Sequence, residues 1–164
     1  MNKFLNSRTI ALGGLTAALY IVLTLLANAF GLASGMIQVR VSEALCILPC
    51  FFPEAIPGLF IGCLISNIIT GSAIWDIIFG SLATLIGAIG TYLWRKNRWL
   101  APLPPILANT LIIPFVLAYA YGVEEGIWLL AITVGIGEFL SVFVLGELLY
   151  SGLAKRKDIS FRDK

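Results

Sequence analysis

The chain has 164 residues, of which 59% are hydrophobic and only 12% are charged, and its formal net charge is +2. This composition excludes an ordinary soluble domain, in which about half of the residues are apolar and about a quarter are charged. With a mean hydropathy of +0.96, the sequence predicts an integral membrane protein. Because a bilayer core about 30 Å thick needs about 20 apolar residues per helix, the chain has room for about six helices.

Six apolar segments follow one another along the chain. Their continuous apolarity predicts helices, because strands of a membrane barrel would alternate between apolar and polar residues. The predicted helices span about 9–30, 40–52, 54–69, 74–94, 103–121 and 126–153. The second and third are short enough to form one broken hairpin, since neighbouring protein can satisfy a backbone interrupted by proline and glycine. The expected fold is an all-α integral membrane protein, a six-transmembrane-helix bundle in which residues 1–164 form a single transmembrane domain.

Basic residues fall on one side of this predicted topology. If the N-terminus is cytoplasmic and six spans alternate, ten of the eleven Lys and Arg residues are inside and only Arg40 is outside. The inside residues are Lys3, Arg8, Arg95, Lys96, Arg98, Lys155, Arg156, Lys157, Arg162 and Lys164. This asymmetry agrees with the positive-inside rule. We therefore expect a multi-pass protein of the cell membrane with both termini in the cytoplasm.

The sequence carries none of the familiar motifs of membrane-embedded chemistry. It contains no Gly-x-x-x-x-Gly-Lys-Ser/Thr loop, so the chain cannot by itself couple ATP hydrolysis to transport. It contains no histidine, and Cys46, Cys50 and Cys63 are its only cysteines, which favours buried packing over a metal site. We expect no enzyme activity, no metal, no cofactor in this chain and no nucleic-acid partner. Uphill transport would then depend on an ion gradient or on another subunit.

Two polar side chains stand near the middle of predicted helices. Glu138 lies about 18 Å from the outer end of its helix at 1.5 Å per residue, and Asn109 lies at about the same depth in the preceding helix. Polar residues inside a membrane are costly and usually face the protein interior or a cavity. The two could therefore bond each other across antiparallel helices, which would fix the bundle by about 0.6 kcal/mol. Alternatively they bind a ligand, because Gly135 and Gly137 leave open backbone beside the carboxylate.

Further candidates lie nearer the predicted outer end of the bundle. Aromatic walls above a few convergent polar groups are typical of small-ligand sites. Arg40 and Glu43, three residues apart, could form a solvated ion pair, close the mouth of a site or touch the ligand. The candidate substrate-binding residues are Glu138, Asn109, Trp75, Asp76, Arg40, Glu43, Tyr119 and Trp128. Glu147, near the cytoplasmic end, is expected to meet a partner subunit or to reach the interface.

Small residues recur at a spacing of four in the first predicted helix. Gly13 and Ala17 form one such pair, and Gly14 and Ala18 form a second that overlaps it. Small residues at this spacing let membrane helices approach closely. The stripe can therefore pack inside the bundle or dock a partner subunit.

Three stretches of the sequence together carry a likeness to a known family, namely QVRVSEALCILPCFFPEAIPGLFIGCLISN, PPILANTLIIPFVLAYAYG and GIGEFLSVFVLGELL. Through them the chain resembles the QueT family of queuosine-precursor transporters, which are substrate-binding (S) components of energy-coupling factor (ECF) importers. The most specific parts are Arg-x-Ser-Glu-Ala-Leu and Gly-x-Gly-Glu. The resemblance implies a six-helix bundle in the bacterial plasma membrane that captures a 7-deazaguanine such as preQ1 or preQ0. It also implies a transmembrane coupling subunit and two partner ATPase subunits that use ATP. Gly13, Gly14, Ala17 and Ala18 take the place of the family's docking alanines.

The chemistry of such a ligand suits the candidate residues. Its 2-amino-4-oxo pyrimidine edge presents adjacent N–H donors, which a carboxylate accepts in bidentate fashion. Glu138 would supply this carboxylate, Asn109 would read the carbonyl and ring nitrogens, and an aromatic candidate would stack on the ring. The cationic aminomethyl group of preQ1 would pair with Glu43 or Asp76.

Two other interpretations stay open. The chain could be an S component for another vitamin, such as riboflavin, thiamine or biotin. It could also be a proton- or sodium-driven secondary carrier in which Glu138 is the ion site.

Overall fold

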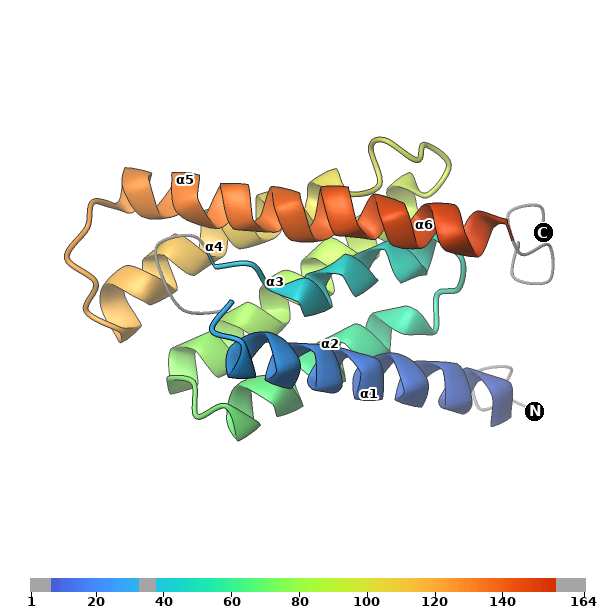
Figure 1. Cartoon of the computed structure of the whole chain (residues 1–164), viewed down its shortest axis with the longest axis horizontal. Helices are drawn as coiled ribbons and strands as arrows, with labels where there is room; N and C mark the ends of the chain where they lie inside the picture. Colours follow the sequence, from blue (N-terminus) through green and yellow to red (C-terminus); the bar gives the residue numbers. More distant parts are fainter. Residues whose placement is uncertain (1–6, 33–37, 156–164) are drawn as a thin grey trace.

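The computed structural model describes residues 7–32 and 38–155, and every regular element within them is a helix. The elements are α1 (Ser7–Ala29), η2 (Val41–Cys50), α2 (Ala55–Ile69), α3 (Ile74–Trp94), α4 (Leu103–Ala120), α5 (Ile127–Glu138), η3 (Phe139–Leu145) and α6 (Gly146–Ala154). The last three run on as one helix from Ile127 to Ala154 (Figure 1). The prediction of an all-α protein is confirmed. Each predicted segment coincides with a helix whose ends differ from the prediction by a few residues.

Helix length divides these elements into two groups. Four helices are long and apolar enough to cross a membrane, namely α1, α3, α4 and the helix Ile127–Ala154. The other two, η2 with 10 residues and α2 with 15, are shorter. They form a hairpin that turns at Pro53 (Figure 1). The described residues thus contain six apolar helices, of which four have full spanning length.

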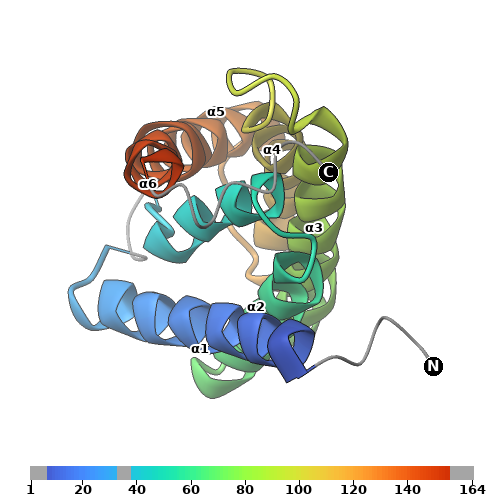
Figure 2. The same cartoon turned by 90° about the vertical axis from the view of Figure 1, so that its right-hand side faces the viewer.

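The short helix η2 occupies the centre of the bundle. It lies between α1 and the helix Ile127–Ala154, with α2 and α3 along its remaining sides (Figure 2). Its residues Ser42–Pro49 are all buried, and Leu45 and Leu48 belong to the main apolar core with Tyr20, Leu59 and Val142. An element surrounded on every side needs no polar face. This is why η2 reads as a short apolar run despite the carboxylate it carries.

The two ends of the bundle differ in charge. The first turn of α1, the last turn of α6 and the loop between α3 and α4 lie at the same end (Figure 1). There Arg98 of that loop bonds to Glu147 and donates to Ser151 Oγ of α6 at 2.7 Å. Glu147 is therefore paired within the chain, and its expected contact with a partner subunit or the interface stays a prediction. The opposite end carries the exposed acidic residues Glu124 and Glu125.

Helices α1 and α2 pack closely at their small residues. A Cβ atom on Gly58 would lie 2.5 Å from the Gly13 carbonyl oxygen, so these backbones are in contact. Ala17 is buried on the same side of α1. By contrast, nothing lies within 4 Å of a Cβ on Gly14, and Ala18 is exposed. The four small residues thus divide into an internal pair that packs on α2, Gly13 and Ala17, and an outward pair, Gly14 and Ala18.

Candidate functional site

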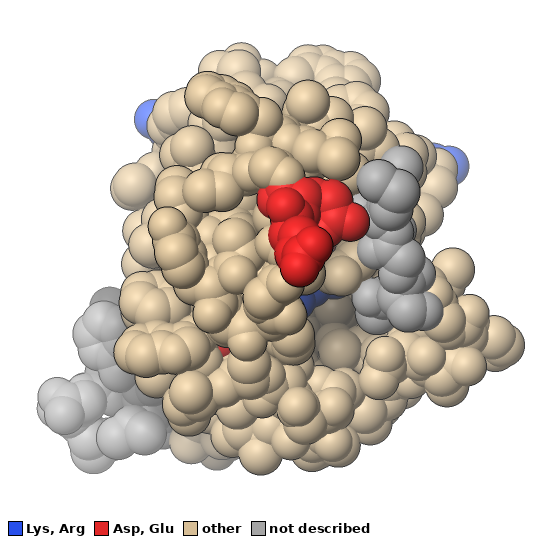
Figure 3. All heavy atoms as spheres, turned by 90° about the vertical axis from the view of Figure 1, so that its left-hand side faces the viewer, with Lys and Arg blue, Asp and Glu red and all other residues tan. Residues whose placement is uncertain are grey.

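A cavity of about 350 Å³ lies at the acidic end of the bundle, between α1, α2, α3 and the last turns of α4. Figure 3 shows this end, with a hollow beside the exposed acidic side chains and basic atoms inside it. The lining is rich in hydrogen-bonding groups, including Tyr20, Thr24, Asn28, Gln38, Arg40, Ser42, Asn67, Thr70, Ser72, Asp76 and Tyr121. Its volume falls at the lower end of the range of about 300–1,000 Å³ for small-ligand pockets. The cavity is therefore suited to one small polar molecule.

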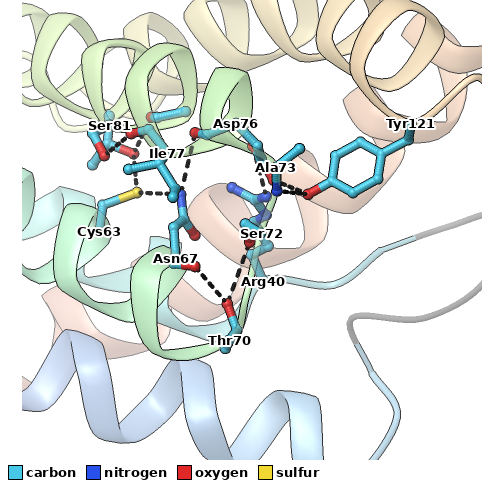
Figure 4. Close-up of polar contacts among 12 residues, drawn as sticks. Arg40, Cys63, Asn67, Thr70, Ser72, Ala73, Asp76, Ile77, Ser81 and Tyr121 are labelled. Carbon is cyan, nitrogen blue, oxygen red and sulfur yellow. Dashed lines mark hydrogen bonds and ion pairs between the residues drawn. The ribbon is translucent and has the colours of Figure 1, made fainter.

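Asp76 is the centre of the polar contacts on one wall of this cavity (Figure 4). Tyr121 donates a hydrogen bond to Asp76 Oδ2 at 2.9 Å, and Nη2 of Arg40 lies 3.7 Å from Asp76 Oδ1. The Asn67 amide donates to the Asp76 carbonyl oxygen at 3.3 Å. Asp76 Oδ1 is buried and accepts no hydrogen bond. One oxygen of the Asp76 carboxylate, Oδ2, is therefore hydrogen-bonded, and the other, Oδ1, is not.

Tyr121 follows the last residue of α4 and holds the mouth of the cavity together. Its hydroxyl oxygen accepts a hydrogen bond from the Ala73 N–H at 3.1 Å while its proton goes to Asp76. Partial burial raises the pKa of the Tyr121 phenol, and the negative charge of Asp76 raises it further. The phenol therefore stays protonated near neutral pH and acts as a donor to the carboxylate.

A second cavity of about 290 Å³ adjoins the first and extends along α5 to Thr133 and Val134. Gln38 lines both cavities. Its carbonyl oxygen packs on α5, because a Cβ on Gly137 would lie only 2.2 Å from it. Gln38 therefore lies at the junction of the two cavities and beside the residue that precedes Glu138.

Glu138 and Asn109 are brought together, as the sequence predicts. Both side chains are buried, and the Glu138 carboxyl group is within hydrogen-bonding reach of the Asn109 amide. Asn109 also donates to the Pro105 carbonyl oxygen at 3.2 Å. However, Asn109 Oδ1, Glu138 Oε2 and the hydroxyl of Ser141 have no hydrogen-bond partner. Buried polar atoms in this state are costly, so the pair is incomplete as a purely structural contact.

Glu43 lies in the middle of the bundle and is fully buried. Its Oε1 accepts hydrogen bonds from Tyr20 and, at 3.2 Å, from Thr84, while Cys46 Sγ donates to Oε2 at 2.9 Å. Glu43 does not line either cavity. It is therefore a bonded core carboxylate, and Arg40 pairs with Asp76 rather than with Glu43.

The predicted aromatic wall is not found at the cavity. Trp75, Tyr119 and Trp128 are 54%, 80% and 86% exposed, respectively, and none of them lines the two cavities. Trp75 stacks on Phe79, and both lie with Tyr119 in an apolar groove on the outer surface between α3 and α4. These three aromatic residues therefore face the surroundings of the bundle. Tyr20 and Tyr121 are aromatic residues that do line the cavity.

The structure adds residues that the candidate set lacks. Asn67 lines the cavity and carries a signal in the sequence, since it is an amide inside a predicted membrane helix. Gln38 has no such signal, because its position depends on how the chain before η2 crosses α5. Within the described residues, no group of three or more His, Cys, Asp and Glu side chains could hold a metal ion.

A model of the QueT transporter family matches residues 10–155 of the chain. The chain belongs to the QueT transporter family. A relative from Lactococcus lactis subsp. cremoris (strain MG1363), the queuosine precursor transporter QueT, is 31% identical over an alignment of 157 residues, and the match covers 89% of this chain and 92% of the relative. None of the solved structures compared with the chain matches it.

Membership of the QueT family confirms the resemblance drawn from the sequence. It makes the chain a transport protein and not an enzyme. Together with four long apolar helices, it makes the chain a multi-pass protein of the cell membrane.

Proposed function

We propose that this QueT protein is the S component of an ECF importer and that it captures a queuosine precursor, a 7-deazaguanine, outside the cell. The observation that carries the proposal is the cavity of about 350 Å³ lined by hydrogen-bonding side chains at the acidic end of the bundle. The name of the Lactococcus relative supports the substrate class. The capacity of the cavity for one small polar molecule supports it as well.

In the proposed topology, six helices cross the membrane and both termini are cytoplasmic. The loop with Arg95, Lys96 and Arg98 lies at the same end of the bundle as the start of α1 and the end of α6, in agreement with an even number of crossings. Basic residues favour the cytoplasmic side. The cavity at the opposite end would then open to the outside.

Transport energy comes from partner subunits in this proposal. The sequence contains no phosphate-binding loop. A transmembrane coupling subunit and two ATPase subunits would bind the chain and use ATP. The outward pair Gly14 and Ala18 is the proposed docking contact on α1, because these small residues leave open surface, whereas Gly13 and Ala17 are used up in packing on α2.

Glu138 and Asn109 are the proposed readers of the ligand's pyrimidine edge. Their unpartnered oxygens, Glu138 Oε2 and Asn109 Oδ1, are available acceptors in the bundle interior. A 2-amino-4-oxo edge offers adjacent N–H donors that match such acceptors. Glu138 and Asn109 line neither cavity, and Gln38, which lines both cavities and packs beside Gly137, would contact the ligand next to Glu138.

One observation favours a second candidate function. The buried, unpartnered oxygens of Glu138, Asn109 and Ser141 would also suit an ion site in a secondary carrier. Liposomes that contain only this chain separate the two functions. Uptake driven by a proton or sodium gradient without ATPase subunits would contradict the ECF proposal.

The direct test of the proposed function is mass spectrometry of ligand that co-purifies with the chain from bacterial membranes. We expect a 7-deazaguanine at up to one molecule per chain, which added preQ1 or preQ0 displaces. A bound riboflavin, thiamine or biotin would assign the chain to another vitamin and overturn the proposal.

A further inference from the structure

Asp76, which lines the cavity, carries a buried carboxylate oxygen that has no hydrogen-bond donor. Asp76 is 5% exposed and lines the cavity, and its Oδ1 accepts no hydrogen bond. The other oxygen of the same carboxylate is satisfied by Tyr121. A buried carboxylate oxygen without a donor costs free energy that a charged donor from a ligand would recover. Asp76 Oδ1 is therefore a vacant acceptor in the cavity wall.

The contact between Asp76 and Arg40 leaves this acceptor available. Their 3.7 Å separation is longer than a hydrogen bond, so Arg40 compensates the charge without bonding to Oδ1. A ligand donor at Oδ1 thus replaces a loose ion pair and breaks no hydrogen bond there.

Gly80, one turn along α3, packs directly against this oxygen, with no side chain between them. A Cβ atom at Gly80 would lie 3.0 Å from Asp76 Oδ1, 3.3 Å from Asn67 Nδ2 and 4.0 Å from Arg40 Nη1. The missing side chain therefore leaves the three polar groups around one point. An alanine at this position would crowd all of them.

Among the carboxylates near the acidic end, Asp76 is the buried one that lines the first cavity. Glu43 accepts from Tyr20, Thr84 and Cys46 and does not line the cavity. Glu124 and Glu125 are exposed at the same end of the molecule, where acidic side chains flank the hollow (Figure 3). Their charges are solvated and screened by salt, so neither of them is a buried acceptor for a ligand.

We infer that Asp76 Oδ1 forms a subsite for an ammonium group, so that the cavity selects a 7-deazaguanine with a cationic aminomethyl substituent over one with a neutral substituent. This inference rests on the proposed function, and it places the specificity for the substituent at Asp76, apart from the recognition of the pyrimidine edge. An ammonium group is a compact donor of up to three hydrogen bonds. It suits a single carboxylate oxygen in a narrow space.

The test compares two ligands that differ only in this substituent. Calorimetry on the purified full-length chain measures the affinities for preQ1, which carries the aminomethyl group, and for preQ0, which carries a nitrile. We expect Asp76→Asn to weaken preQ1 binding at least about tenfold and preQ0 binding less than about threefold. Asn can keep the hydrogen bond from Tyr121 through its carbonyl oxygen, and it puts an uncharged NH2 donor in place of the acceptor Oδ1.

Two further variants complete the design. Gly80→Ala puts a methyl group against Oδ1 and leaves the charge in place, and we expect the same selective loss of preQ1 binding. Glu124→Gln removes a carboxylate at the same end outside both cavities and serves as the matched control, with preQ1 binding changed less than about threefold.

The outcomes are distinguishable. Equal losses for both ligands in Asp76→Asn and Gly80→Ala, or unchanged preQ1 affinity, would overturn the subsite and leave the proposed function standing. If the wild-type chain binds neither compound, the proposed function fails and the subsite fails with it.

Discussion

The hydroxyl of Tyr20 donates a hydrogen bond to Oε1 of Glu43 and so joins α1 to η2 in the centre of the bundle. Thr84 of α3 donates to the same oxygen, and Cys46 donates to Oε2. Three elements thus meet at one fully buried carboxylate. Buried carboxylates persist only where such donors surround them. This network holds the floor beneath the cavity, because Tyr20 also lines the cavity.

Removal of the Tyr20 hydroxyl is expected to weaken the bundle. Tyr20→Phe leaves Glu43 with one donor fewer in a buried place, and we expect a loss of about 0.6–3 kcal/mol in the free energy of unfolding. Thermal unfolding of the purified chain in detergent measures this loss. The matched control is Tyr119→Phe, because Tyr119 is 80% exposed. Equal stability of the two variants would show that the network contributes nothing.

The pair formed by Arg98 and Glu147 is expected to fix the basic loop to α6. Arg98 also bonds to Ser151 and lies 4.8 Å from the centre of the Tyr150 ring, so its removal breaks several contacts at once. We expect Arg98→Ala to cost about 1–2 kcal/mol of stability. Lys96→Ala in the same loop removes an exposed cation and should leave the unfolding temperature unchanged. The same shift in both variants would contradict this role.

The sequence predicts the positions of the helices well, but it predicts poorly which side of each helix faces the interior of the bundle. Long apolar runs must form helices in a membrane because no water is present to satisfy the backbone. The direction in which a side chain faces is harder to predict, since lipid and the protein interior are equally apolar. Trp75 and Asp76 are neighbours, and a helix turns by about 100° between them. Asp76 accordingly lines the cavity while Trp75 faces outward.

The depth of two residues in the membrane predicts their contact better than their closeness in the sequence does. Equal distances from the outer ends predict the approach of Asn109 and Glu138, which the structure confirms. The spacing of Arg40 and Glu43 suggests a pair, but Arg40 turns to Asp76 instead. That choice depends on the position of α3 beside the start of η2. It is a tertiary contact with no counterpart in local sequence.

Gly137 tests the position of Gln38 at the junction of the two cavities. A Cβ at this residue would lie 2.2 Å from the Gln38 carbonyl oxygen, so Gly137→Ala must displace that segment. We expect a loss of preQ1 affinity of at least about fivefold in calorimetry, because Gln38 lines both cavities. Gly135→Ala is the matched control, since its Cβ would meet only Thr110 at 3.4 Å. Full affinity in Gly137→Ala would remove Gln38 from the binding account.

The outward pair on α1, Gly14 and Ala18, allows a test of subunit assembly that is separate from ligand binding. Gly14→Leu adds bulk where nothing lies within 4 Å, so ligand binding should stay within about twofold of the wild type. Co-purification with the coupling subunit and the ATPases should fall at least about fivefold. Ile86→Trp enlarges an exposed residue on α3 and serves as the control. Normal assembly of the Gly14 variant would place the docking contact elsewhere.

Calorimetry with preQ1 on the isolated chain, wild type and Glu138→Gln, tests the central claim most directly. The proposed account predicts saturable binding of one ligand per wild-type chain without any ATPase subunit. It also predicts at least about a tenfold loss of affinity in Glu138→Gln, because the amide cannot accept both N–H donors of the pyrimidine edge. An absence of binding to the wild type, or an affinity that Glu138→Gln leaves unchanged, would contradict the account.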